Sequence, residues 1–346
     1  MSAATHHPNL LHSIGLRRQL VLVTAVVILL ALMAIDLTTG PSGMTLNTLW
    51  QSLWSGPNGP DRAAAAILWQ IRLPQTLTGA LVGICLGMAG LMMQTILANP
   101  LASPYTLGFS AAAGLGAALV ILFGSSLPLA LWISVPVAAF IFTLLACSMV
   151  YLMARFRSSS TEMLVLSGIV VLFFFQSLQS LLQYLAAPEV LQQIVFWLFG
   201  SLTKASWVSV TIIAIILIFS LPWILRDAWN LTSLCLGDLN AASLGLNVAA
   251  LRRRIFILIA LLTAAAVSFT GTIGFIGLMH IGRALVGEDH RFSLPLAGIL
   301  GAIILVAASI VGKLISTGAV IPIGIVTAIA GIPMLAIVIY KTGNPK

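Results

Sequence analysis

The stretch RLPQTLTGALVGICLGMAGLMMQTILANPLASPYTLG, residues 72–108, decides the fold. It opens with an apolar run as long as the roughly 20 residues that a helix needs to cross a bilayer core. Four glycines recur within that run at helical spacing, namely Gly79, Gly83, Gly87 and Gly90. One face of the predicted helix is therefore almost bare backbone, which favours close packing against another helix; lining a pathway through the membrane is the alternative.

The predicted helix ends at a break that two prolines enforce. Gln94 lies near its end, where a buried amide needs a hydrogen-bonding partner. The segment NPLASP follows, beginning with Asn99 and Pro100. Because a residue before a proline disfavours helix, the sequence predicts an extended turn between two helices.

The composition places the whole chain in a membrane. Of its 346 residues, 60% are hydrophobic and only 7% are charged, whereas soluble domains carry about 25% charged residues. So few charges cannot cover a water-facing surface of this size. This excludes a soluble enzyme, a nucleic-acid-binding protein and a disordered scaffold, and it indicates an all-α polytopic membrane protein.

Ten segments are apolar enough to cross a bilayer. They are 19–37, 76–97, 106–123, 129–153, 163–186, 208–225, 254–272, 274–287, 294–314 and 323–340. The seventh and eighth are nearly continuous, so the boundary around Gly271–Gly277 is the least distinct. We therefore predict about ten transmembrane helices in a single domain over 19–341, preceded by a cytoplasmic tail over 1–18.

The distribution of basic residues decides the predicted orientation. If the N-terminus is cytoplasmic, all but four of the 16 Lys and Arg residues lie inside. The four exceptions are Arg62, Arg72, Lys204 and Lys313. This bias follows the positive-inside rule. We therefore predict that both termini are cytoplasmic.

Two absences from the sequence limit the mechanism. No phosphate-binding loop of the form Gly-x-x-x-x-Gly-Lys-Ser/Thr occurs, so any energy from ATP must come from a partner. Acidic residues and histidines are nearly absent at membrane depth, which counts against an ion-coupled secondary carrier. The cysteines Cys85, Cys147 and Cys235 have neither disulfide nor metal-ligand spacing. We predict no catalytic residue, cofactor or metal site in this chain.

Four further stretches complete the pattern that the first one begins. They are FWLFGSL (196–202), LGDLNAASLG (236–245), GFIGL (274–278) followed by His280, Arg283, Gly287, Asp289, His290 and Arg291, and IPIGIVTA (321–328). Together these motifs resemble the FecCD-type permease subunits of bacterial ABC importers for iron–siderophores, haem and vitamin B12, which are type II importers. The resemblance runs from residue 20 to residue 340 and implies ten helices in each subunit.

The resemblance implies a coupling role for the loop over 236–247. This loop would hold short helices that dock in a groove of an ATPase subunit. Its coupling residues would be Gly237, Asp238, Ala241, Ala242 and Gly245. Asp238 is also expected to accept a helix-capping hydrogen bond.

Two more pairs of residues take roles from the resemblance. Thr161 and Glu162, at the inner start of the fifth span, would narrow the pathway to a cytoplasmic gate. Arg72 and Lys313 would face an external binding protein, where charges mainly steer docking.

The resemblance also implies partners and a location. The expected partners are two ATPase subunits, a second permease copy, a periplasmic or lipid-anchored binding protein and membrane lipid, without nucleic acid. The expected location is a bacterial inner membrane, crossed several times. The predicted cargo is a ferric siderophore, with haem or cobalamin as the alternative within the family and an ion-coupled carrier as the alternative outside it.

The chain departs from the family pattern at several positions. Gln75 stands where relatives commonly have an arginine, and only Met279 separates Leu278 from His280. An outer Asp–Arg–Glu set has become Ser309, Lys313 and Val320. Losing the acids together with the arginine indicates a rewired polar cluster. Docking of a binding protein would then rest on fewer charges, which slightly favours a heterodimeric over a homodimeric permease.

Overall fold

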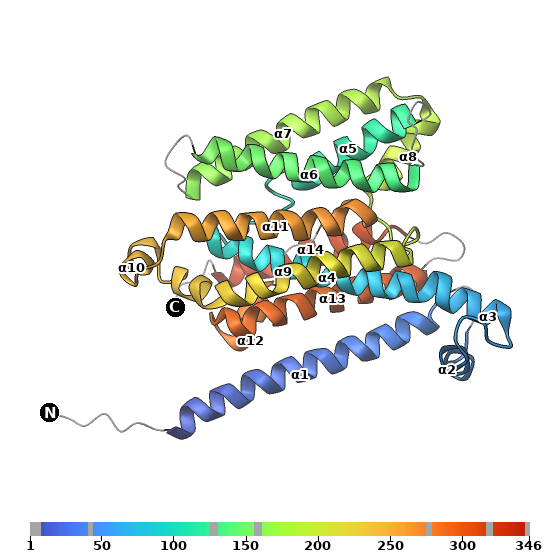
Figure 1. Ribbon diagram of the computed structural model, residues 1–346, viewed down its shortest axis with the longest axis horizontal. Coiled ribbons are helices and arrows are strands. Elements are labelled where there is room, and N and C mark those ends of the chain that lie inside the picture. The colour runs from blue at the N-terminus through green and yellow to red at the C-terminus, as the bar shows by residue number, and fades with distance from the viewer. Residues whose placement is uncertain are drawn as a thin grey trace.

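The computed structural model describes residues 8–40, 44–124, 131–155, 161–274, 279–315 and 321–342. Within these ranges every regular element is a helix, and the long helices run side by side along one direction (Figure 1). The prediction of an all-α membrane protein is confirmed. Seven helices in the described ranges are long and apolar enough to cross a membrane: α1 (Pro8–Thr38), the continuous helix Arg62–Ile96, α6 (Leu131–Arg155), α7 (Thr161–Leu185), α9 (Trp207–Leu234), α11 (Val248–Thr270) and α13 (His290–Ile315).

The remaining predicted spans are shorter. The third and tenth correspond to the apolar helices α5 (Phe109–Phe123) and α14 (Ile323–Thr342). The eighth corresponds to α12 (Met279–Val286), which has eight residues. At 1.5 Å per residue this helix is about 12 Å long, less than half of a bilayer core. Residues 275–278, which hold most of the GFIGL motif, lie outside the described residues.

The second predicted span begins earlier than the sequence indicated. The elements α3 (Arg62–Ala66), the π-helical turn η1 (Ile67–Arg72) and α4 (Leu73–Ile96) follow one another without a break. Pro74 lies in the first turn of α4, where its ring would press on the carbonyl one turn earlier in a regular helix. The wider turn of η1 directly before it relieves that contact, so the proline does not end the helix.

Three short helices connect or flank the long ones. They are α2 (Leu46–Ser55), α8 (Pro188–Leu198) and α10 (Asp238–Ser243). The sequence analysis did not predict α2 and α8, because each is an amphipathic helix of about three turns that a search for apolar spans passes over. In addition, α1 begins at Pro8, well before the predicted start at residue 19.

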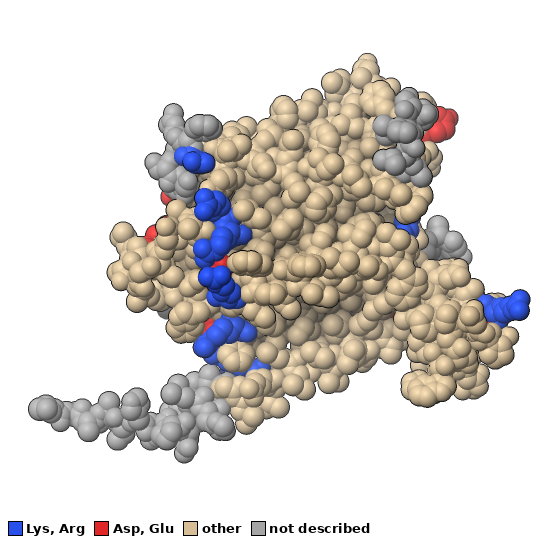
Figure 2. All heavy atoms as spheres, in the orientation of Figure 1, with Lys and Arg blue, Asp and Glu red and all other residues tan. Residues whose placement is uncertain are grey.

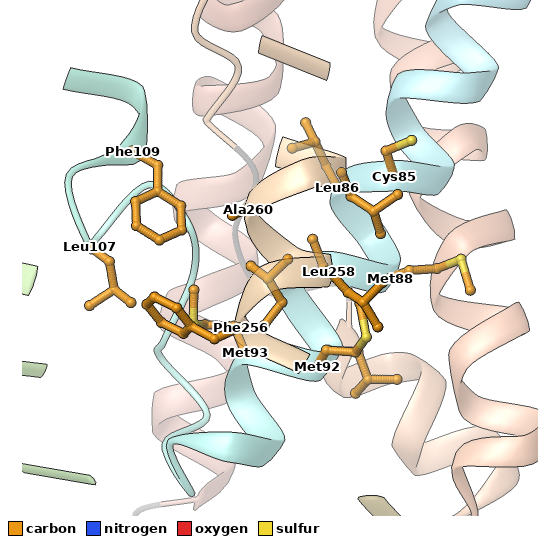
Figure 3. Close-up of a cluster of buried hydrophobic side chains, with 14 of the residues drawn as sticks. Cys85, Leu86, Met88, Met92, Met93, Leu107, Phe109, Phe256, Leu258 and Ala260 are labelled. Atoms are coloured by element: carbon orange, nitrogen blue, oxygen red, sulfur yellow. The ribbon is translucent and has the colours of Figure 1, made fainter. Parts of the chain in front are cut away.

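The core of the fold lies around α4, which packs against α13, α11 and α9. In the apolar part of the continuous helix 83% of the residues are buried, compared with 22% in α1, whose apolar surface must therefore face lipid or a partner. Figure 3 shows side chains of α4, such as Met92 and Met93, meeting those of α11. Phe109, at the start of α5, joins them by an edge-to-face contact with Phe256, 5.9 Å between ring centroids.

A second group of helices covers one side of this core. It contains α5, α6, α7 and α8, which lie together in Figure 1, and α6 contacts α11. The helix α1 lies on the opposite side, against α13. The core helix α4 is thus enclosed between these two outer parts.

The glycines of α4 lie where the two most closely packed helices meet. A Cβ atom at Gly83 would lie 2.5 Å from backbone atoms of Ala302 in α13, and one at Gly87 would collide with the carbonyl of Ala297. Gly90 is buried on the same helix, and Gly79 faces the side chain of Leu202. For Gly83 and Gly87 the packing interpretation of the glycine pattern therefore has a direct geometric basis.

We predict that Gly83→Ala lowers the stability of the protein by about 1–3 kcal/mol, the usual cost of overpacking. The neighbour is backbone of α13 and cannot rotate away. The matched control is Gly282→Ala in α12, where the nearest atom would lie 3.7 Å away, an ordinary contact. The measurement is the thermal unfolding midpoint in detergent. Equal midpoints for the two variants would contradict the packing model.

Candidate functional site

The segment 236–247 forms a small helical projection at one end of the molecule (Figure 1). Its helix α10 is flanked by Gly237 and Gly245, whose φ angles are +93° and +85°. Both glycines have open space where a Cβ would lie, so they serve the left-handed backbone rather than close packing. The two turns let the chain leave α9, form α10 and return into α11.

Several large apolar side chains are exposed on the surface of this projection. Leu236, Leu239 and Leu244 have exposed fractions of 61%, 88% and 63%, whereas Ala241 on the inner side is fully buried. Ala242 is exposed beside them. Large apolar side chains that project from a helix end beyond the membrane-spanning bundle indicate a surface that a protein partner covers.

The carboxylate of Asp238 does not cap its helix. The N-cap residue of α10 is Gly237, and no side chain forms a capping hydrogen bond there. Asp238 instead forms an ion pair with Arg252 of α11, with 2.9 Å between Nη1 and Oδ2. The capping role predicted for Asp238 is therefore wrong: Asp238 is the first residue inside the helix rather than its N-cap, and its carboxylate binds the guanidinium of Arg252.

The two predicted gate residues lie close to this ion pair. Thr161 is the first residue of α7, and its hydroxyl accepts a hydrogen bond from Arg252 Nη2 at 3.0 Å. Glu162 follows it and is exposed. The structure thus brings the predicted gate and the predicted coupling loop to one end of the bundle, joined by a residue that the sequence analysis had assigned no role.

The break after α4 lies at the same end. Gln94 is buried in the last turn of α4, and Ala98 has a φ of +44° where the chain turns. The Asn99 side chain accepts a hydrogen bond from the backbone amide of Leu101 at 2.9 Å, which closes a local turn at Pro100. The chain stays non-helical until Phe109, as the two prolines predicted.

A buried polar cluster that the sequence did not predict lies beside this break. His290 is fully buried, and its Nε2 lies 2.7 Å from the Thr95 hydroxyl of α4. Arg283 donates to the same hydroxyl at 2.6 Å, and the backbone amide of His290 donates to Thr232 of α9 at 2.9 Å. These contacts join four helices, α4, α9, α12 and α13, and they explain His290 as a structural residue rather than a metal ligand.

Basic side chains gather in a band around this end of the molecule (Figure 2). Arg18 of α1 lies 3.3 Å from Asp289, which Arg291 also binds at 2.8 Å. The hydrogen bonds from Arg291 are the main reason that the pKa of Asp289 lies below its ordinary value. Other members of the band lie over aromatic rings, as Arg226 does over Trp223. Such a band is typical of the membrane–water interface on one side.

The opposite end of the bundle carries a compact charged cluster around Asp36, which is fully buried. Lys313 Nζ lies 2.8 Å from Asp36 Oδ1, and the Thr76 hydroxyl donates to Oδ2 at 2.5 Å. Arg72, 4% exposed, donates to the carbonyl of Leu37 and interacts electrostatically with Asp36. The two residues predicted to face a binding protein therefore have their charges turned inward in this chain.

Three of the positions at which the chain departs from the family pattern meet at this end. Gln75, Ser309 and Lys313 line one small cavity, together with residues of the loop after α8. Val320 lies outside the described residues. Because Lys313 binds Asp36, a carboxylate on another helix, the predicted rewiring has a physical form: the acid that neutralises this cation comes from α1.

Two of the motifs also meet here, through contacts with backbone carbonyls. The amide of Ser201 donates to the carbonyl of Thr270 at 2.7 Å, and the Thr272 hydroxyl donates to the carbonyl of Leu198. A Cβ at Gly324, in the first turn of α14, would collide with the carbonyl of Phe199. The motifs at 196–202 and 321–328 therefore build the junction of α8, α11 and α14.

We predict that Asp36→Asn destabilises the protein more than Lys313→Met does. The first variant leaves two buried cations, Lys313 and Arg72, without their shared carboxylate, and an unpaired buried charge costs about 3–5 kcal/mol. The second leaves Asp36 beside Arg72. The measurement is again the thermal unfolding midpoint in detergent. A larger loss for Lys313→Met would contradict the assignment of Asp36 as the shared acid.

Comparisons with known proteins agree with this arrangement. The model of the FecCD transport family matches residues 27–341. The hemin transport system permease protein HmuU of Yersinia pestis is 34% identical over 310 residues, which cover 88% of this chain and 92% of that protein. The molybdate import system permease protein MolB of Haemophilus influenzae is 32% identical over 313 residues, which cover 89% of this chain and 91% of that protein.

The fold agrees as well. A solved structure assigned to a metal-chelate type ABC transporter, in an inward-facing conformation, has a TM-score of 0.81 and 30% identity with this chain, and the match covers 92% of this chain and 98% of that one. The family model spans nearly the whole chain, and each of the two relatives named above is more than 30% identical to this chain. The chain is therefore a multi-pass membrane permease and belongs to the FecCD transport family of ABC importers.

Proposed function

We propose that this permease carries a ferric siderophore across a bacterial inner membrane, driven by ATP that separate ATPase subunits hydrolyse. The single observation that supports this best is the apolar surface of α10, with Leu239 88% exposed at the end of the bundle. In a permease without a protein partner, leucines exposed to the cytoplasm would be unfavourable. One that docks an ATPase needs such a surface.

The proposed orientation places α10 in the cytoplasm. The band of basic residues in Figure 2 lies at the end that carries α10, and the positive-inside rule assigns that end to the cytoplasm. The N-terminal half of α1 lies at this end too, since Arg18 binds Asp289 there. We infer that the chain crosses the membrane ten times, as its apolar segments predict, and that both termini are cytoplasmic.

The length of α1 between its two charged contacts supports a position of this helix across the membrane. Arg18 and Asp36 mark the two ends of the membrane-embedded part of α1; Arg18 is paired with Asp289, directly before α13, and Asp36 with Lys313 of α13. Eighteen residues separate them in one helix, which corresponds to about 27 Å at 1.5 Å per residue. This is close to the thickness of a hydrocarbon core, about 30 Å. The two charged clusters would then lie at the two membrane surfaces.

The proposed complex contains two copies of a permease chain, two ATPase subunits and an external binding protein. ATP-driven closure of the ATPases would push on α10 and shift the two permeases between outward and inward states. Thr161 and Glu162 would form part of the cytoplasmic gate. At the outer surface Arg72 and Lys313 would support docking of the binding protein indirectly, by holding the end of α1 against α4 and α13.

The identity of the cargo is the most specific part of the proposal. The two named relatives carry hemin and molybdate in their names, so shared family does not by itself decide the cargo. A ferric chelate is favoured because the structural neighbour is assigned to the metal-chelate type. Haem and cobalamin are the alternatives. An ion-coupled carrier is disfavoured further, because the carboxylate of Asp36 is held by Lys313.

The test is uptake of radio-iron by cells that lack this subunit, with and without the chain restored. The cargo panel contains several ferric siderophores, and haem and cobalamin are assayed alongside. We expect one ferric siderophore to be taken up only when the chain is restored. Rescue by haem or cobalamin alone would overturn the siderophore proposal and keep the importer.

A pair of variants at one position tests the dependence on the ATPase. Ala242→Arg adds bulk and charge to the exposed side of α10, whereas Ala242→Ser does not. We expect the arginine variant to lose at least about tenfold in uptake, since a desolvated charge costs several kcal/mol, and the serine variant to retain it. Uptake by the arginine variant at the unaltered rate, with equal membrane insertion, would contradict docking through α10.

A further inference from the structure

The guanidinium of Arg252 joins three separate segments at the cytoplasmic end of the proposed orientation. Its Nη2 donates to Asp238 Oδ1 at 2.9 Å and to the Thr161 hydroxyl at 3.0 Å. Its Nη1 lies 2.9 Å from Asp238 Oδ2, so the pair with Asp238 is two-pronged. Its Nε donates to the carbonyl of Ile96 at 3.1 Å. One side chain of α11 thus binds α10, α7 and α4.

This arrangement uses what distinguishes arginine from lysine. The guanidinium is a rigid plane with five N–H donors at fixed angles, so the positions of its three partners are set relative to one another. The carbonyl of Ile96 is among the last four of its helix, which have no partner within α4. The side chain of Arg252 is 12% exposed and that of Asp238 is 53% exposed, and each bond that the guanidinium donates is charge-assisted.

The helix α10 has few other attachments to the bundle. It is six residues long, and among the described elements its main contacts are with the neighbouring helices α9 and α11. Its other polar side chains bond within the segment, as Asn240 does to the carbonyl of Leu236 and Ser243 to that of Asn240. A push on α10 therefore reaches the rest of the molecule through its two glycine-flanked ends, through buried Ala241 and through the pair of Asp238 with Arg252.

The first turn of α7 lies at the other end of this connection. Thr161 is separated from Arg252 by 91 positions in the sequence, and its hydroxyl accepts a hydrogen bond from the Arg252 guanidinium at 3.0 Å. Neither α7 with α10 nor α7 with α11 is among the described helix pairs that pack extensively against each other. Movement of α10 can therefore reach the start of α7 through Arg252.

We propose that Arg252 is a positioning residue that transmits displacement of α10 to the inner end of α7, so that ATPase movement and opening of the cytoplasmic gate stay coupled. This inference rests on the proposed function and adds the residue that performs the coupling inside the permease. Asp238 receives the movement, Arg252 carries it and Thr161 passes it to α7. The neighbouring Arg253 is exposed and lies outside this connection.

The first experiment measures coupling at the Thr161 end. The complete complex is reconstituted in proteoliposomes with the cargo that the uptake panel identifies, and cargo molecules moved per ATP hydrolysed are counted. Thr161→Val removes the acceptor with little change in shape, and we expect this ratio to fall at least about fivefold, the lower end of typical coupling between sites. Thr161→Ser keeps a hydroxyl and is expected to restore the ratio, and Arg253→Gln is expected to leave it unchanged.

A double-variant cycle separates a shared link from two independent defects. Asp238→Asn weakens the same connection at its other end. If Arg252 joins the two ends, the double variant Asp238→Asn, Thr161→Val is expected to be no worse than the more impaired single variant, because a link broken at one end cannot be broken again. Losses that multiply would overturn the proposal, and so would a ratio for Thr161→Val within twofold of the unaltered chain.

A second measurement needs no cargo, so it distinguishes failure of this inference from failure of the proposed function. Spin labels are placed at Leu239 on α10 and at Leu166 on α7, which are 88% and 54% exposed, after Cys235→Ser removes the exposed native thiol. In the permease alone in nanodiscs we expect a narrow distance distribution that broadens in Arg252→Gln and not in Arg253→Gln. An unchanged distribution in Arg252→Gln overturns the link. If the unaltered complex moves no cargo while this distribution behaves as expected, the proposed function fails and the link stands.

Discussion

The backbone contact between α4 and α13 is the constraint on which the rest of the structure depends. Gly83 and Gly87 bring the two helices so close that no Cβ fits between them. In a membrane, where apolar side chains gain nothing by leaving lipid, such close approach is a main source of helix association. With α4 fixed in this way, α9 and α11 pack on its other sides, and the helices α5 to α8 pack outside them.

Among the described residues, the charged groups that pair across helices lie at the two ends of that packed core. At each end these ion pairs hold helices together. At the α10 end Asp289 ties α1 to α13 through Arg18. At the other end Asp36 does so through Lys313. Because each buried charge has a partner, the core between them can stay apolar. A transported chelate would then meet weak, nonspecific contacts along its path, which suits passage better than tight binding.

The sequence predicted what depends on local pattern and missed what depends on contacts across the fold. Glycine spacing, apolar length and paired prolines predicted α4, its packing face and the break at Asn99, since each acts over a few residues. Nothing along the chain indicates that Lys313 meets Asp36, 277 positions away, or that Asp238 binds Arg252 instead of capping α10. The eighth span was expected to begin at residue 274; its described helix, α12, covers Met279–Val286, and residues 275–278 lie outside the described residues.

The affinity between the purified permease and its ATPase subunit shows whether α10 is the surface that binds the ATPase. The permease is placed in nanodiscs and titrated with its native ATPase. Leu239→Asp puts a charge at the centre of the proposed contact, and Leu46→Asp puts one on a similarly exposed leucine, 71% against 88%, at the opposite end of the bundle. We expect at least about a tenfold loss of affinity for Leu239→Asp, because a buried leucine contributes about 1.5–3 kcal/mol, and no loss for Leu46→Asp. Unaltered affinity in Leu239→Asp would show that α10 is not the surface that binds the ATPase.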